Sequence, residues 1–179
     1  PKQDGNAPEE FDFLGFTFRA RGARNTRQHV TFTSFLPAIS KKSLMKIRDK
    51  VRSWELHRLI QKTIQYVADE ISSYTRGWIN YYSLGSMKKA MTGIDAHLRT
   101  RLRIIIWKQW KVPKKRPWGL QKLGIGKDLA RVTAYCGYRY YWVVTKTCVS
   151  RAISKEVFAK AGLVSCLDYY NERHALKLC

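Results

Sequence analysis

The stretch Tyr74-Thr75-Arg76-Gly77-Trp78-Ile79-Asn80-Tyr81-Tyr82 decides how the rest of the chain is interpreted. It places aromatic rings, an arginine and a glycine close together in a chain rich in lysine and arginine. Apolar residues recur every three or four positions through this stretch and upstream of it, which predicts one apolar stripe on a helix. The residues of this stripe are Ile60, Ile64, Val67, Ile71, Tyr74, Trp78 and Tyr82. We expect the stripe to be core, with Trp78 and Tyr82 holding it together.

The other side of the same helix is polar. Arg76 and Asn80 are one helical turn apart and lie near Asp69 and Ser73, so they can meet solvent or a binding partner. Gly77 has no side chain, which would let a ring, a backbone or a phosphate come close. This face is the first candidate for function.

The charge of the chain indicates the kind of partner. Its 179 residues suffice for one large domain or two small ones, and 45% of them are hydrophobic, so a packed core is expected. Against 34 Lys and Arg there are only 13 Asp and Glu, a net charge of +21. A polyanion is needed to neutralise such an excess, and nucleic acid is the usual one. A membrane surface is the weaker alternative, because no uninterrupted run of about 18 apolar residues occurs.

The cysteines do not indicate a metal site. Cys136, Cys148, Cys166 and Cys179 show no C-x-x-C spacing, and the histidines complete no ligand cluster. We therefore expect neither zinc nor a disulfide framework, and no cofactor in this chain. Scattered free cysteines fit a reducing, cytoplasmic location.

The N-terminal part is expected to be a connector followed by a β-hairpin. Residues 1–10 are polar and acidic and read as a connector from a preceding domain. Residues 11–18 and 30–35 alternate between apolar and polar side chains, as strands do, and Pro37 is expected to end the hairpin. The loop between them carries the arginines Arg21, Arg24 and Arg27, either in a solvated turn or in contact with phosphate.

Three amphipathic helices should follow and form a small bundle. Ser40 is a good N-cap for the first, whose apolar residues are Leu44, Ile47, Val51 and Trp54. The second runs from about residue 56 to 82, either unbroken or with a break near its start, and contains the opening stripe. The third presents on one face Met87, Met91, Ile94, Leu98, Leu102 and Ile105.

Cations gather on the third helix and just beyond it. They are Lys89, Arg99, Arg101, Arg103, Lys108, Lys111, Lys114, Lys115 and Arg116. On a helical wheel Trp107 falls among them, opposite the apolar face. Its ring could stack on a base or sugar, or anchor the next part of the protein, and both interpretations stay open. The cations would contact phosphates.

A second, mostly helical unit is expected after the proline-rich segment 113–119. Residues 128–136 are predicted as a short helix, 138–144 as β-prone, and 149–161 as a helix closed by Gly162. Ser165, with Asp168 three residues later, should begin a final helix in a capping box.

An aromatic cluster lies in this second unit and is interpreted as its core. Any protruding ring would be a stacking platform. The cluster consists of Tyr135, Tyr138, Arg139, Tyr140, Tyr141 and Trp142.

Three motifs resemble one protein family. They are Phe13-Leu14-Gly15-Phe16 after the acidic connector, Arg76-Gly77-Trp78-x-Asn80-Tyr81-Tyr82, and Leu102-Arg103-x-x-x-Trp107-Lys108-x-Trp110-Lys111. Together they are similar to the C-terminal half of bacterial group II intron-encoded reverse transcriptase/maturases, from about residue 11 onward. The resemblance implies a mainly α fold with three parts. Residues 1–36 would be the connector and last hairpin of the polymerase palm, 37–112 the three-helix thumb or maturase domain, and 113–179 a small DNA-binding region.

The resemblance also implies partners and an absent activity. The expected partner is group II intron RNA, with target DNA and RNA/DNA duplex as further partners, no membrane, and a reverse-transcriptase domain preceding this chain. The expected location is the cytoplasm, near the nucleoid. The family's polymerase binds Mg²⁺ at a Y-x-D-D motif that this chain lacks, and Asp69 and Glu70 are adjacent on a helix and so diverge. No catalytic residue or metal ligand is therefore assigned.

Three functional hypotheses remain at this stage. In the first, the chain is an RNA-binding maturase module whose basic groove promotes splicing, with Arg76, Asn80, the loop arginines and the third-helix cluster, Trp107 included, lining the groove. In the second, the same surface is the template–primer clamp of a reverse transcriptase. In the third, the chain is a degenerate remnant of a mobile element.

Overall fold

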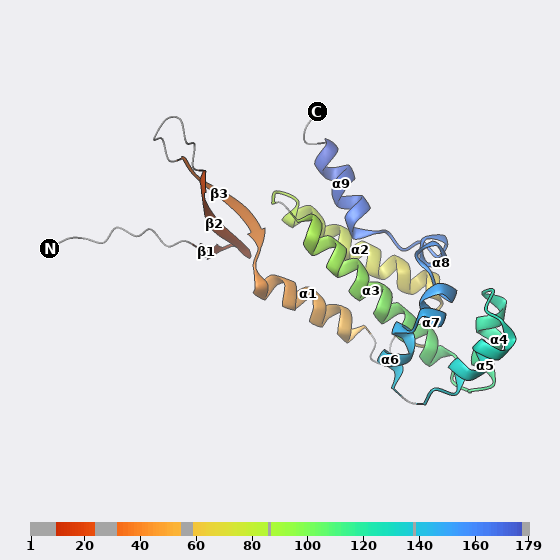
Figure 1. Ribbon diagram of the computed structural model, residues 1–179. Coiled ribbons are helices and arrows are strands. Elements are labelled where there is room, and N and C mark those ends of the chain that lie inside the picture. Colours follow the sequence, from red (N-terminus) through yellow and green to blue (C-terminus); the bar gives the residue numbers. More distant parts are fainter. Residues whose placement is uncertain (1–9, 24–31, 55–58, 86, 138, 177–179) are drawn as a thin grey trace.

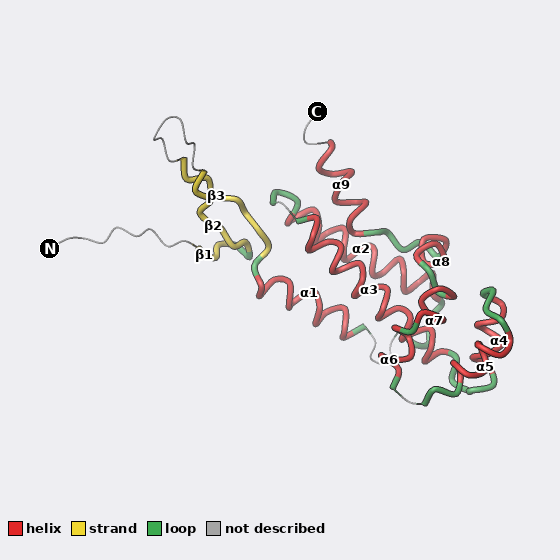
Figure 2. The backbone as a smooth tube through the Cα atoms, in the orientation of Figure 1, coloured by secondary structure: helices red, strands yellow, loops and turns green. Residues whose placement is uncertain are grey.

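The computed structural model describes residues 10–23, 32–54, 59–85, 87–137 and 139–176 (Figure 1). Within these residues the chain is mainly α-helical, with a small sheet at one end and the pair α4–α5 at the other (Figure 2). None of the described helices is long and apolar enough to cross a membrane.

The N-terminal sheet has three antiparallel strands rather than the two expected. They are β1 (Glu10–Phe13), β2 (Phe16–Ala23) and β3 (Phe32–Ile39), in the order β1-β2-β3. The segment predicted as one strand folds back at Leu14 and Gly15, whose φ angles are 47° and 81°. Two successive positive φ values are typical of the tight hairpin turn that suits the twist of a β-ribbon. The alternation on both sides of Gly15 therefore belongs to two strands.

Gly15 joins this sheet to the helices. A Cβ atom at Gly15 would lie 2.6 Å from the Tyr82 hydroxyl and 2.9 Å from the Ser43 hydroxyl, so only glycine fits. The Gly15 carbonyl accepts hydrogen bonds from the Ser40 backbone N–H (2.9 Å) and the Ser43 hydroxyl (3.1 Å). Tyr82 donates to Ser43 Oγ at 2.9 Å. The last ring of the opening stretch thus closes a polar contact between the sheet and the first two helices.

Pro37 does not end the hairpin as predicted, because it lies inside β3 opposite Phe18. In the described sheet β3 is an edge strand, where a residue without an N–H is tolerated. The strand continues to Ile39, and Ser40 then caps α1 (Lys41–Ser53) by accepting from the Ser43 N–H at 3.2 Å. The predicted N-cap is confirmed.

The second helix, α2 (Ile64–Tyr82), is shorter than expected. Residues 59–63 form a turn, and the side chain of Thr63 caps the helix by accepting from the Tyr66 N–H at 3.3 Å. Residues 55–58 lie outside the described residues.

The buried stripe of α2 is also rotated by one position from the predicted one. Val67, Ile71 and Ile79 are buried, whereas Tyr74 is 37% exposed and Trp78 is only partly buried. Thr75 takes the core position between Ile71 and Ile79, because its hydroxyl is satisfied by donating to the Ile71 carbonyl at 2.9 Å.

The third helix, α3 (Lys88–Gln109), confirms its predicted apolar face, since all six of the residues named for it are buried. Later helices depart more from expectation: α4 (Lys115–Lys122), α5 (Lys127–Ala134), α6 (Tyr140–Thr145), α7 (Thr147–Ala152), α8 (Lys155–Lys160) and α9 (Cys166–Leu176). The segment 113–119, predicted as a boundary, runs into α4. The segment 138–144, predicted as β-prone, is helical from Tyr140 onward, in α6. The predicted helix 149–161 is broken into α7 and α8 between residues 152 and 155. The short helix at 128–136 is confirmed as α5.

Two end signals in this region are confirmed. Gly162, with φ of 93°, follows α8, and the N–H groups of Gly162 and Leu163 donate to the carbonyls of Ala159 (3.0 Å) and Phe158 (3.0 Å), the Schellman arrangement. Ser165 Oγ accepts from the Asp168 N–H at 3.4 Å and so caps α9.

The buried core is continuous from the sheet to α9. Helix α9 packs against α2 and α3, and the Tyr170 hydroxyl donates to the Gly85 carbonyl at 2.7 Å. α6 packs against the later part of α3. The division into parts at residues 36 and 112 remains a prediction.

Candidate nucleic-acid interface

The arginines of the hairpin are only partly described. Arg21 lies in β2, but its side chain falls outside the described part of the chain, as do Arg24 and Arg27 altogether. Their contact with phosphate remains a prediction.

Arg76 and Asn80 lie on the exposed side of α2, as expected, and meet α9 there. The Tyr169 hydroxyl donates to Asn80 Oδ1 at 3.1 Å, and the guanidinium groups of Arg76 and Arg173 lie 6.0 and 5.4 Å from the centre of the Tyr169 ring. Arg173, which donates to the phenol oxygen, is the main cause of a lowered pKa of Tyr169. A Cβ atom at Gly77 would meet nothing within 4 Å among the described residues, so no described part of the protein uses the space beside it.

The cations of α3 diverge to different sides of that helix. Arg103 turns toward α7 and α8, where it donates from Nε to the Ile153 carbonyl at 2.9 Å and from Nη2 to the Ser150 carbonyl at 3.4 Å, and lies 5.8 Å from the centre of the Phe158 ring. Burial lowers the pKa of Arg103. Arg103 therefore ties α3 to the segment after α6, and Arg99 lines a small pocket against α8 and α9.

Trp107 and Arg116 form an internal pair. Trp107 has 0% exposed surface, and Arg116 is also buried, with its guanidinium 5.1 Å from the centre of a Trp107 ring. Arg116 donates to the carbonyls of Trp110 (3.2 Å) and Ala134 (3.5 Å). Of the two interpretations of Trp107, the structure favours the anchor: the ring holds α3 against α4 and α5 and has no free face for a base. The remaining cations, Lys89, Lys111, Lys114 and Lys115, are exposed.

Arg101 and Lys108 turn toward α6. Together with Ile104, Arg139 and the start of α6 they line a shallow pocket of about 420 Å³. Tyr141 and Trp142 protrude from this wall, with 60% and 48% of their surfaces exposed.

Cations lie over the aromatic rings of this wall. The Arg101 guanidinium is 6.0 Å from the Tyr141 ring centre, and the Lys146 ammonium is 3.7 Å from that of Trp142. Lys108 lies 5.9 Å from the ring centre of Tyr140. Exposed rings beside cations are the combination that single-stranded nucleic acid requires, because bases stack while phosphates are neutralised.

Helix α1 extends this surface. His97, on α3, has a pKa lowered by burial and by the neighbouring cations Arg101 of α3 and Arg48 and Arg52 of α1. The charges of α1 and α3 therefore act together on one imidazole. We define the α1–α3–α6 face as Arg48, Arg52, Arg101, Lys108, Arg139, Tyr141, Trp142 and Lys146.

Much of this face was not anticipated from the sequence. The aromatic cluster at 135–142 was interpreted as core, yet Tyr135, Tyr141 and Trp142 are exposed; Tyr138 lies outside the described residues. The buried residues of α6 are instead Val143 and Val144. The available signal was the presence of Arg139 and Lys146 on either side of the rings at 140–142, since basic residues clustered beside aromatic rings are typical of a nucleic-acid-binding surface.

Residues 44–124 match the family model of the group II intron, maturase-specific domain. This segment is similar to a maturase-specific domain. The resemblance read from the sequence motifs is thereby confirmed for the part of the chain from α1 to the end of α4. No curated protein matches the chain.

The matched segment contains one half of the α1–α3–α6 face. Arg48, Arg52, Arg101 and Lys108 lie inside the matched segment, and Arg139, Tyr141, Trp142 and Lys146 lie after it. The matched segment also crosses residue 113, where a domain boundary was predicted, and includes the buried Trp107 and Arg116.

Proposed function

We propose that this chain binds structured group II intron RNA across the α1–α3–α6 face and thereby helps the intron reach its splicing-competent fold. The match to a maturase-specific domain supports a maturase role. The observation that carries the RNA contact is the pocket in which Arg101 and Lys108 of α3 lie beside Arg139 and the protruding rings of α6.

The chemistry of the face suits a folded RNA rather than one sequence. Lysine and arginine side chains hold phosphates without reading bases, and structured RNA is recognised largely through its shape and backbone. Tyr141 and Trp142 add a stacking surface for unpaired bases in loops or bulges. The net charge of +21 draws RNA to the protein at long range.

The proposal is tested by measuring affinity for a structured group II intron RNA as a function of salt. The logarithm of the binding constant should fall with the logarithm of salt concentration by about 0.7–0.9 for each phosphate neutralised. A variant with Lys108→Gln, Arg139→Gln and Lys146→Gln should bind more weakly, with a slope shallower by roughly 2 to 3.

The matched control carries Lys127→Gln, Arg131→Gln and Lys160→Gln, three exposed cations on α5 and α8. This control loses the same net charge but leaves the α1–α3–α6 face intact. It should therefore retain the salt slope and most of the affinity for RNA. Equal losses in the two variants would show that total charge, and not this face, holds the RNA. A flat salt dependence of the unmodified protein would refute the proposal.

A further inference from the structure

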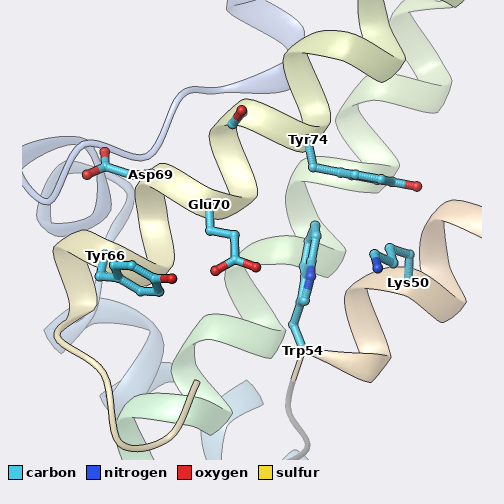
Figure 3. Close-up of a pocket in the computed structure, with 7 residues that line it drawn as sticks. Lys50, Trp54, Tyr66, Asp69, Glu70 and Tyr74 are labelled. Atoms are coloured by element: carbon cyan, nitrogen blue, oxygen red, sulfur yellow. The ribbon is translucent and has the colours of Figure 1, made fainter. Parts of the chain in front are cut away.

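A second pocket, of about 520 Å³, lies between the end of α1 and the first half of α2 (Figure 3). Its aromatic walls are Trp54, Tyr66 and Tyr74. Trp54 and Tyr74 meet edge to face, with ring centres 5.3 Å apart and planes at 88°. Tyr66 is 46% exposed, and the Lys62 ammonium lies 5.4 Å from its ring centre. The volume and the walls suit a flat aromatic group.

The pocket also contains a carboxylate. Figure 3 shows the Glu70 side chain extending into the space between Tyr66 and Trp54, whereas Asp69, which also lines the pocket, points away from that space. Within the part of the chain that the structure describes, no cation forms an ion pair with Glu70. An ionised carboxylate only accepts hydrogen bonds, so the complementary ligand presents donors.

Lys50 limits which donor-bearing ligand fits. It is one of the residues that line the pocket, and its ammonium lies 5.9 Å from the ring centre of Tyr74. A cation in the lining disfavours a lysine or arginine side chain of a partner protein and favours a nucleotide, whose phosphate it can contact. Lys50 is on α1, the same helix as Arg48 and Arg52 of the α1–α3–α6 face.

Among the bases, guanine matches Glu70 best. Its N1–H and N2–H groups are parallel donors on one edge and can both bind a single carboxylate, whereas adenine and cytosine each present one amino group there and uracil presents one ring N–H. We propose that the α1–α2 pocket takes an unpaired guanine of the bound RNA, stacked against the exposed ring of Tyr66, with its N1–H and N2–H donated to Glu70. This inference rests on the proposed RNA-binding function.

The test compares guanine with inosine, which lacks only the N2 amino group. Two fluorescently labelled uridine oligonucleotides of about six nucleotides carry one guanine or one inosine at the same position, and their affinities are measured by anisotropy. Because the second hydrogen bond is lost, the guanine RNA should bind about tenfold more tightly than the inosine RNA. In Glu70→Gln this ratio should fall to about one, since the amide cannot accept both donors.

The matched control is Glu172→Gln, which removes the same charge from an exposed position on α9. It should keep the guanine-to-inosine ratio of the unmodified protein. The ratio is the decisive quantity, because loss of any carboxylate strengthens binding to every RNA through charge alone.

The outcomes separate this inference from the proposed function. Equal affinity for the guanine and inosine RNAs, in a protein whose RNA affinity still falls with salt, overturns the guanine pocket alone. If the oligonucleotides do not bind, titration with GMP against IMP, followed through the Trp54 indole signal by NMR, tests the pocket directly. A lysine-rich peptide that binds the protein but not Glu70→Gln, with no preference for guanine, would identify a cation site and overturn the inference.

Discussion

The role of Asp95 could not be predicted from the sequence, because its hydrogen-bond partners lie about 70 residues further along the chain. Asp95 lies on α3 and is buried, with 6% of its surface exposed, yet it caps the distant helix α9. Its carboxylate accepts from the N–H groups of Cys166 (2.8 Å) and Leu167 (3.1 Å) and from the Ser165 hydroxyl (3.0 Å). A negative charge at a helix N-terminus is stabilised by the helix dipole. Burial, together with the nearby Asp95 carboxylate, raises the pKa of the Cys166 thiol, so this cysteine stays protonated.

Replacement of Asp95 by alanine should lower the free energy of unfolding by about 1–3 kcal/mol, because it leaves buried N–H groups without acceptors. The measurement is urea denaturation followed by circular dichroism. Asp168→Ala is the control, since Asp168 is exposed and pairs with Lys155 at 3.4 Å, and an exposed ion pair contributes about 0–1 kcal/mol. Equal effects of the two substitutions would contradict the capping role.

At the scale of elements, α1 and α3 meet where cations are crowded. His97 of α3 is held among Arg48 and Arg52 of α1 and Arg101 of its own helix, and its pKa is lowered by burial first and by these charges second. A protonated His97 would add a fourth positive charge to this contact. The crowding costs stability in the free protein and is relieved when an anion binds, which is a common property of nucleic-acid interfaces.

The folded protein should therefore become less stable as the pH is lowered, because the contact between α1 and α3 disfavours protonated His97. The unfolded chain protonates His97 as the pH falls through the ordinary value of 6.5, while the folded protein, with its lowered pKa, does not. The unfolded state then binds more protons, so the free energy of unfolding should fall between about pH 7.5 and pH 5.5. His97→Gln should show a smaller fall over this range in urea denaturation. An unchanged pH dependence would show that His97 does not titrate as inferred.

At the scale of the whole molecule, repulsion between the excess positive charges opposes the stabilisation that the continuous core provides. The net charge of +21 repels itself in the folded protein, while the core runs from Phe16 in the sheet to Tyr170 in α9. Salt screens the repulsion over about 10 Å at 0.1 M. The same salt also weakens any contact with RNA.

Added salt should therefore raise the melting temperature of the free protein and reduce the increase in melting temperature that RNA causes. For the free protein, raising NaCl from about 50 to about 300 mM should raise the melting temperature, because screening reduces self-repulsion. With saturating structured intron RNA at low salt, the melting temperature should first rise by linkage, and this gain should shrink as salt increases. Differential scanning fluorimetry measures both. A gain from RNA that does not depend on salt would contradict electrostatic binding.

Sequence patterns within one or two helical turns predicted the structure correctly for the buried face of α3 and for several helix ends. The apolar face of α3, the caps at Ser40 and Ser165 and the end signal at Gly162 were predicted from neighbouring residues and are confirmed. Each depends on spacing within a turn or two of helix or on the backbone geometry of one residue, which the sequence states directly. The mainly helical fold and the maturase-specific resemblance follow from the same local signals.

The choice of which rings are buried was made by tertiary structure. Trp107, on the polar side of α3, is covered because α4 and α5 fold over it and Arg116 reaches its ring, whereas Tyr141 and Trp142 stay exposed because α6 presents Val143 and Val144 to α3. An aromatic side chain suits a core and a binding surface equally well, so the residue type alone does not show whether a ring is buried or exposed. The amino-acid sequence thus determined the apolar face of α3, the caps at Ser40 and Ser165 and the charge. Long-range packing alone decided that the cations of α3 separate and that Arg101 and Lys108 lie beside the exposed rings of α6.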